Sequence, residues 1–382
     1  MTGPLAGVVV ADFSRVLAGP LAATTLADLG ATVVKIERPG VGDDTRQWGP
    51  PWSETTSTYF ECANRTKQSV ELDLADDADL EVALGIARTA DVLIENFRPG
   101  TLAARGLAYD DLRAVNPRLV YCSISGFGSD AGAHLPGYDF LVQAVGGLMS
   151  ITGSPATEPT KVGVALVDVL TSKDAVAGIL AALLERQTSG GGQRVEVNLL
   201  SSLLGSLANQ ASAYLATGTS PGRLGNRHPS IAPYEILRCA DGPLAICCGN
   251  DGQFARLTAA LGVPGLAQEP RFVSNALRVE HREALAHLLE EALAAAPAAA
   301  WVDALTEHGV PAGEVGDIGS AFALAERLGL RPRVAVGAGH VDQVAHPVTF
   351  SRTPVSHYGP PPSLGEHNDA VRRRYGPQVR ST

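Results

Sequence analysis

The stretch GVVVADFSRVLAGPLAATTLADLGATVVKI, residues 7–36, decides the predicted fold. Its first part, Gly7 to Phe13, is apolar apart from Asp12 and is of the kind found in buried strands. Pro20 suits the first turn of a following helix, because its missing N–H would have no helical partner there. Gly30 suits the C-terminal cap of that helix, and a second strand-like run follows from Thr32 to Ile36. Strand, helix and strand in this order indicate a βαβ unit with parallel strands.

The same alternation continues through the first third of the chain. Strand-like runs occur at Asp91 to Phe97 and at Leu119 to Ser125, and a helix-like segment lies between them from about Leu102 to Val115. A long helical pattern covers Thr171 to Arg186, and a strand-like run follows from Arg194 to Leu199. We therefore predict an α/β fold whose large domain is a doubly wound, Rossmann-like parallel sheet.

A second, smaller α/β domain is predicted beyond residue 220. Residues 221–233 are rich in Gly, Arg and Pro and read as a linker, and the tail from about Arg331 is Pro-rich and irregular. The predicted boundaries are 1–220 plus 331–382 for the large domain and 221–330 for the small one. The small domain is expected to contain strands near Tyr234–Leu237 and Leu244–Cys248 and helices near Gln253–Leu261, Glu280–Ala296 and Ala298–His308.

Composition narrows the class of protein. A chain of 382 residues that is 45% hydrophobic can bury the cores of two domains. Its 40 acidic and 30 basic residues give a net charge of −10, which disfavours a nucleic-acid partner. The five cysteines form no CxxC pair and the nine histidines show no close ligand spacing, so reduced thiols and no metal site are expected.

No membrane partner is expected either. Residues 197–222 carry no charge, but their serines, Asn209 and Gln210 are too polar for lipid, so a buried or subunit-facing helix is expected. The N-terminal segment lacks the basic start of a secretory signal and reaches Asp12 and Arg15 early. The expected location is cytoplasmic.

Familiar catalytic motifs give little support to other enzyme classes. Gly126 to Ala131 fits the dinucleotide pattern GxGxxA after a strand, but it is not in the first βα turn. The sequence contains no P-loop, no HExxH and no GxSxG elbow. A glycine-rich loop is the plainer interpretation.

Asp168 is the unusual carboxylate of the chain. It ends the apolar run Val162 to Val167 just before the predicted helix, where burying a carboxylate is expensive. It could serve as a helix cap, although Thr171 or Ser172 would do so equally well. Apolar surroundings also raise the pKa of a carboxyl and strengthen it as a nucleophile, so a catalytic role is the second reading.

Separated sequence blocks over nearly the whole chain form a recognisable set. They are Val10–Pro20, Val34–Pro39, Asn64–Lys67, Glu95–Gly100, Gly137–Asp139, Lys161–Gly163 with Asp168, Gly225–Pro229, Gly249–Asn250, Gly309–Gly313 and Leu364–His367. Together they resemble the family III coenzyme A transferases, which include formyl-CoA and carnitine CoA-transferases. The resemblance implies an aspartate nucleophile, and Asp168 occupies that position. Ser172 departs from the glycine that the family often has four residues after it.

The resemblance further implies that acyl-CoA and a small carboxylic acid are the substrates, with no prosthetic group and no metal. It also implies an interlocked homodimer. The residues that it places near CoA or the acyl group lie in the quoted blocks, except Arg105, which follows the block Glu95–Gly100. They are Val16, Leu17, Arg38, Asn64, Lys67, Asn96, Phe97, Arg98, Arg105, Tyr138 and Gly249.

Two alternatives remain open at this point. The related α-methylacyl-CoA racemases carry Gly-His-Asp where this chain has Gly137-Tyr138-Asp139, and a phenol is a poorer proton shuttle near neutrality than an imidazole. A CoA-binding relative without transfer activity is the other alternative, which Asp168 disfavours. Leu17 stands where some formyl-CoA transferases have glutamine, which weakens an oxalate-specific reading.

Overall fold

A computed structural model describes residues 3–377 of the chain. These residues form two compact units. Unit 1 contains residues up to 148, residues 161–219 and the chain from 331 onward, and unit 2 contains residues 149–160 and 220–330. Residues 149–160, which the predicted boundaries assign to the large domain, thus group with unit 2.

Unit 1 is built around a six-stranded sheet in which every pair of neighbouring strands is parallel. The strand order is β3-β2-β1-β4-β5-β6, so the chain reverses its direction of winding after β3. This confirms the predicted doubly wound α/β sheet. The strands are β1 Val9–Asp12, β2 Thr32–Glu37, β3 Gln68–Glu71, β4 Val92–Glu95, β5 Val120–Ser125 and β6 Arg194–Asn198.

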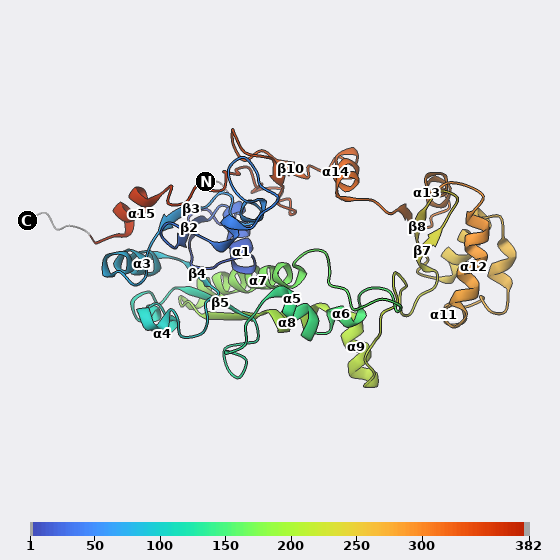
Figure 1. Ribbon diagram of the computed structural model, residues 1–382, viewed down its shortest axis with the longest axis horizontal. Coiled ribbons are helices and arrows are strands. Elements are labelled where there is room, and N and C mark those ends of the chain that lie inside the picture. The colour runs from blue at the N-terminus through green and yellow to red at the C-terminus, as the bar shows by residue number, and fades with distance from the viewer. Residues whose placement is uncertain (1–2, 378–382) are drawn as a thin grey trace, which may run out of the picture. The chain divides into compact units, whose positions relative to one another are not determined.

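Helices cover both faces of this sheet (Figure 1). Adjacent residues of a strand point to opposite faces, so Val10 joins one core and Ala11 the other. Both cores are apolar, which explains the continuous hydrophobic runs in the strands. The first core is completed by α1 Ala18–Asp28, α7 Leu166–Ser189 and α8 Leu199–Ser206, and the second by α3 Asp77–Thr89, α4 Tyr109–Val115 and α15 Asn368–Tyr375.

Two predicted helices of unit 1 have different bounds. The segment predicted as one helix from Leu102 to Val115 is a 3-10 turn followed by α4, because Gly106 has a φ of 66° between them. Helix α7 begins at Leu166, five residues before its predicted start, so Asp168 lies inside its first turn and not ahead of it. The remaining short elements are η1 Asp44–Gln47, α2 Thr58–Glu61, η2 Ala103–Arg105, α5 Asp139–Val145, α6 Leu148–Ile151 and α9 Ala208–Thr217.

Unit 2 is a smaller α/β unit with a three-stranded antiparallel sheet, β7-β8-β9. Its core gathers Leu244, Ile246, Phe254 and Leu289. The helix predicted near residues 280–296 is α12, and a short helix that was not predicted, α11, precedes it and meets it at His281. The elements are β7 Tyr234–Arg238, β8 Pro243–Cys247, α10 Asp251–Ala260, η3 Pro264–Gln268, α11 Asn275–Glu280, α12 Arg282–Leu293, α13 Ala298–Glu307, β9 Ala312–Glu314 and α14 Ile318–Arg327.

The C-terminal tail belongs to unit 1 and contains more structure than its sequence indicates. Strands β10 Arg333–Val334 and β11 Gln343–Val344 pair antiparallel. Near the end, Asn368 accepts a hydrogen bond from Glu71 N–H, and Arg372 donates one to the Glu71 carbonyl. These bonds attach α15 to the edge strand β3.

The charge-free segment 197–222 forms the end of β6, then α8 and α9. Helix α9 contains no buried residue, so the expectation of a buried helix is wrong for α9, and only the subunit-facing alternative remains for it. Among residues 3–377, no helix has both the length and the apolar character needed to span a membrane.

Candidate active site

Asp168 is half-buried in the first turn of α7 and lines a cavity of about 600 Å³. Burial raises the pKa of its carboxyl to about 7, and the nearby Asp139 carboxylate adds to this rise. No hydrogen-bond donor contacts the Asp168 carboxylate within the described part of the chain. The group is therefore a desolvated carboxyl that can reach its anionic form near neutral pH.

The cavity lies at the carboxyl ends of the central strands, where open α/β sheets bind their ligands. It is lined by the turn after β1, the segment after β4 and the loop after β5. In this loop the backbones of Gly126 and Gly137 touch, and a side chain at either position would collide with the other. The first glycine of the GxGxxA pattern thus closes a loop against Gly137. Of the predicted residues, Val16, Leu17, Asn96, Phe97, Arg98, Tyr138 and Asp168 come together here.

The turn between β1 and α1 is held in an unusual conformation. Val16 has a φ of 69°, which is rare for a β-branched residue. Its N–H donates to the Asp43 carboxylate at 3.3 Å. The side-chain amide of Asn96 donates to the Arg15 carbonyl and accepts from the Arg15 N–H, both at 2.8 Å. Asn96 therefore shapes the cavity wall through the backbone of its neighbour.

A buried ionic network lies behind this turn. Lys67 pairs with Asp12 at 2.8 Å and also donates to the Pro20 carbonyl and to Asn64. Lys35 pairs with Asp43 at 2.9 Å. Burial lowers the pKa of Lys67 to about 8 against the opposing pull of Asp12. The polar groups of Asn64 and Lys67 are thus occupied inside the protein, and neither residue lines the cavity of Asp168.

A second cavity, of about 260 Å³, shares Arg15 and Phe97 with the first. It contains the predicted residues Arg38 and Arg105. The Arg15 guanidinium lies 4.7 Å from the centre of the Phe97 ring. Arg38 pairs with Asp44, and its buried Nε has no hydrogen-bond partner among residues 3–377. These arginines give a local basic surface on an acidic protein, suited to phosphate groups.

Arg15, His134 and Tyr59 were not among the predicted site residues. Arg15 and His134 line the cavity of Asp168. Burial, together with the carboxylates of Asp168 and Asp139, raises the pKa of Tyr59 to about 12, which places this phenol in their electrostatic neighbourhood. The Tyr59 ring packs edge-on against Trp48. Tyr59 lies in a helix of only four residues and Trp48 lies at the end of another, and helices this short give no periodic pattern, so only the fold could identify these neighbours.

Two further features lie elsewhere. Gly249 belongs to unit 2, where its N–H donates to Gln253 at the start of α10, and its role near the acyl group stays a prediction.

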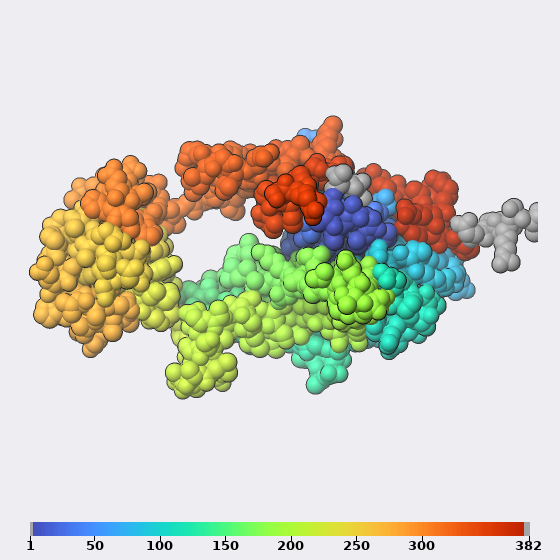
Figure 2. All heavy atoms as spheres, turned by 180° about the vertical axis from the view of Figure 1, so that it is seen from behind, coloured from blue at the N-terminus to red at the C-terminus, as the bar shows by residue number. Residues whose placement is uncertain are grey.

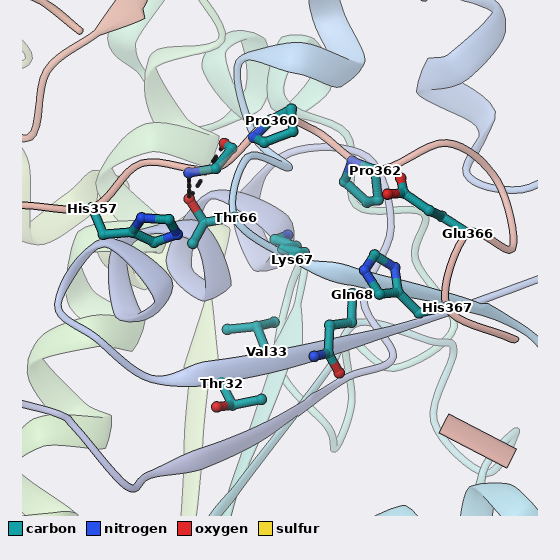
Figure 3. A pocket seen from close by; sticks show the side chains of 11 residues that line it. Thr32, Val33, Thr66, Lys67, Gln68, His357, Pro360, Pro362, Glu366 and His367 are labelled. Atoms are coloured by element: carbon teal, nitrogen blue, oxygen red, sulfur yellow. Dashed lines mark hydrogen bonds between the residues drawn. The ribbon is translucent and has the colours of Figure 1, made fainter. Parts of the chain in front are cut away.

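A third cavity, of about 250 Å³, opens at the amino ends of β2 and β3 and is lined by Thr66, His357 and His367 among others (Figure 3). The described residues contain no group of three or more His, Cys, Asp or Glu arranged for a metal ion.

Named proteins are similar to this chain over nearly its whole length. The succinate–glutarate CoA-transferase of Agrobacterium fabrum is 42% identical to this chain. The match covers 96% of this chain and 94% of that protein. The acetyl-CoA:oxalate CoA-transferase of Acetobacter aceti is 41% identical over 98% of this chain and 96% of its own. The crystal structure of a CAIB/BAIF family protein from Brucella suis superimposes with a TM-score of 0.88, is 41% identical and covers 98% of this chain and all of its own.

The sequence profile of CoA-transferase family III matches residues 5–368. This match spans both units and includes every residue of the cavity that Asp168 lines. The chain therefore belongs to CoA-transferase family III and is an enzyme that transfers coenzyme A.

Proposed function

We propose that this enzyme moves CoA from an acyl-CoA thioester to a carboxylic acid, with Asp168 as the covalent nucleophile. The observation that carries the proposal is a desolvated carboxyl, with a pKa of about 7, in the wall of the cavity at the carboxyl ends of the strands. Such a carboxylate is poorly solvated and has no donor to weaken its attack. The reaction needs a carboxylate that attacks a thioester and then carries the acyl group in an activated form.

The steps balance without any other reactant. A carboxylate oxygen of Asp168 attacks the thioester carbonyl carbon, the C–S bond breaks, and CoA leaves as a thiolate. The thiolate attacks the Asp168 carbonyl of the resulting anhydride, releasing the donor acid and leaving CoA on Asp168 as a thioester. The acceptor carboxylate attacks this thioester and expels the thiolate. The thiolate then takes the acceptor acyl group from the second anhydride, which restores the Asp168 carboxylate.

The basic groups near the cavity support the binding mode of CoA. Arg38 and Arg105 line the cavity next to that of Asp168, and Arg98 lines the cavity of Asp168 itself. We place the adenosine and phosphates of CoA against these arginines, and the thioester against Val16, Leu17, Phe97 and Tyr138. Asn64 and Lys67 support the site from inside the protein, through Asp12 and α1.

The acceptor is proposed to be a small dicarboxylic acid. Relatives of this chain are named for succinate, glutarate, oxalate and mesaconate. Arg15 and His134 in the cavity wall offer a cation and a hydrogen-bonding group for the second carboxylate. Leu17 provides no polar partner for oxalate, which favours the longer acids.

We also propose that the two units are the enzyme's two domains and that it works as a homodimer. Helices α9 and α14 bury none of their residues, although both carry large aliphatic side chains. Leu215 on α9 is 81% exposed and Ile318 on α14 is 80% exposed. Figure 2 shows the yellow-green α9 at the surface. Exposed apolar patches mark protein interfaces, and Tyr214 beside Leu215 on α9 is also exposed. This supports the interlocked dimer, and the cytoplasmic location stays a prediction.

A matrix of acyl-CoA donors and carboxylic acids, read by mass spectrometry of the CoA products, tests the proposed function. Transfer from succinyl-CoA to glutarate or a similar dicarboxylate is the expected result, and Asp168→Asn should abolish it. In heavy water, the α-carbon of a 2-methylacyl-CoA should stay unlabelled. Deuterium uptake that depends on Asp168 and occurs without transfer would replace the proposal with racemisation.

A further inference from the structure

Helix α7 has no N-terminal cap of its own. Its N-cap position is Ala165, which has no side-chain acceptor. The carboxylate of Asp139, at the start of α5, supplies the missing acceptor from another element. Its Oδ1 accepts hydrogen bonds from the Val167 N–H at 2.8 Å and, more weakly, the Asp168 N–H at 3.4 Å. Asp139 thus takes the helix N–H groups that lie closest to the nucleophile.

The side chain of Gln143 holds Asp139 in position at the start of α7. Its side chain is fully buried. The Nε2 group donates to Asp139 Oδ2 at 2.7 Å and lies 3.4 Å from the Val164 carbonyl, while Oε1 accepts from the Val162 N–H at 2.9 Å. One amide therefore joins Asp139 to the segment that enters α7. Because each amide atom faces a group of the opposite kind, the side chain cannot be flipped without losing both strong bonds.

The charges around Asp168 point to Asp139 as the polar neighbour that can be varied. Apart from burial, its carboxylate is the cause of the raised pKa of Asp168. Tyr59 faces the pair from α2, and Arg15, Asp44, Arg98 and His134 line the same cavity. Three of the elements that pack against α7 add no free charge near Asp168. Helix α8 has no ionisable side chain, and Asp28 of α1 pairs with Arg65. In β6, Arg194 and Glu196 pair with each other.

We propose that Asp139 and Gln143 are a positioning pair for Asp168, an inference that rests on Asp168 being the nucleophile. The pair holds the first turn of α7 in place and withholds its N–H groups from the Asp168 carboxylate. The nucleophile therefore stays basic, with a like charge beside it. Acylation neutralises Asp168 and removes this repulsion, which favours the attack on the thioester.

Asp139→Asn tests the pair because it removes the charge and retains an oxygen for the helix N–H groups. The acid limb of kcat/KM should move to lower pH by roughly one pH unit. Infrared difference spectra between each protein and its Asp168→Asn version should show the same displacement for the protonated Asp168 carboxyl, without substrate. Asp174→Asn, on an exposed position of α7, is the matched control and should move neither.

The double variant Asp139→Asn/Gln143→Glu provides a second test if the single variant folds poorly. It retains the hydrogen bonds with reversed polarity and returns a charge to the pair, so both midpoints should move back toward the wild-type pH. An infrared midpoint that drops while the acid limb of activity stays would uphold the pair and count against Asp168 as the nucleophile. An infrared midpoint unchanged in folded Asp139→Asn would overturn the pair.

Discussion

At the scale of single residues, Asp168 lies where folding works against its charge. The carboxyl loses water at the start of α7 and faces the Asp139 carboxylate, and both effects favour its protonated form. A reactive carboxylate is thus maintained at a cost in stability, which is common at catalytic positions. This cost can be measured without any substrate.

Asp168→Asn should stabilise the protein above neutral pH. The folded pKa of about 7 lies above the usual carboxyl value, so between about pH 4 and pH 7 the folded state binds more protons than the unfolded state. Stability from this group is therefore present at acid pH and lost as the pH rises. The variant should gain on the order of 2 kcal/mol at pH 8 and little at pH 4 in urea unfolding. An equal gain at both pH values would contradict the raised pKa.

Arg38→Ala should raise KM for acyl-CoA about tenfold and leave kcat nearly unchanged. A contact with the adenosine end is equally strong in the ground state and the transition state, so its loss weakens binding alone. Steady-state kinetics with saturating acceptor measure this. Arg113→Ala, on the exposed side of α4, is the control. A collapsed kcat with an unchanged KM would place Arg38 at the reacting centre.

At the scale of secondary-structure elements, the sequence predicted what periodicity and end signals encode. The strands β1, β2, β4 and β5 follow from their continuous apolar runs, and α1 follows from Pro20 and Gly30. Strand β3, Gln-Ser-Val-Glu, was not predicted, because its polar side chains find their partners far along the chain. Ser69 donates to Glu37 of β2, and Glu71 accepts from Asn368 in the C-terminal tail. Contacts of that range leave no local pattern.

The start of α7 shows the same limit at the site. Its first turn, before Thr171, has a cap from Asp139, a residue 29 positions from Asp168. The expectation that the helix begins later rested on the helical spacing of the apolar residues between Thr171 and Arg186. Asp168 itself was identifiable, since a carboxylate in an apolar run is visible in the sequence. Its partners Asp139, Gln143 and Tyr59 were not, because tertiary structure alone brings them there.

Lys67→Met should destabilise the protein by about 3–5 kcal/mol, because it leaves the fully buried Asp12 without its cation. Asp12 ends β1, Lys67 directly precedes β3, and Lys67 also bonds to Pro20 of α1. The cooperative unfolding transition should therefore show the full loss of stability. KM for acyl-CoA in the folded variant should change less than about twofold if Lys67 is a supporting residue. Lys173→Met, an exposed site on α7, is the control. A large rise in KM with normal stability would make Lys67 a CoA contact.

At the scale of the whole molecule, helices α9 and α14 leave aliphatic side chains in solvent, and in the proposed homodimer a second copy of the chain covers them. Leu215→Glu should shift the protein from dimer to monomer in analytical ultracentrifugation, since a charge at the centre of an apolar contact leaves no partner for it. Val115→Glu is the control, because Val115 is also exposed but lies at the end of α4. A dimer of unchanged affinity in Leu215→Glu would remove α9 from the interface.

The most direct test of the central claim is to trap the acyl group on Asp168. The enzyme is incubated with succinyl-CoA without acceptor, and hydroxylamine is added to convert any activated carboxyl to a hydroxamate. Peptide mass spectrometry should place the modification on Asp168, and Asp168→Asn should carry no label and show no transfer. Label on a different carboxylate, or a folded Asp168→Asn enzyme that transfers CoA at the wild-type rate, would contradict the assignment of Asp168 as the nucleophile.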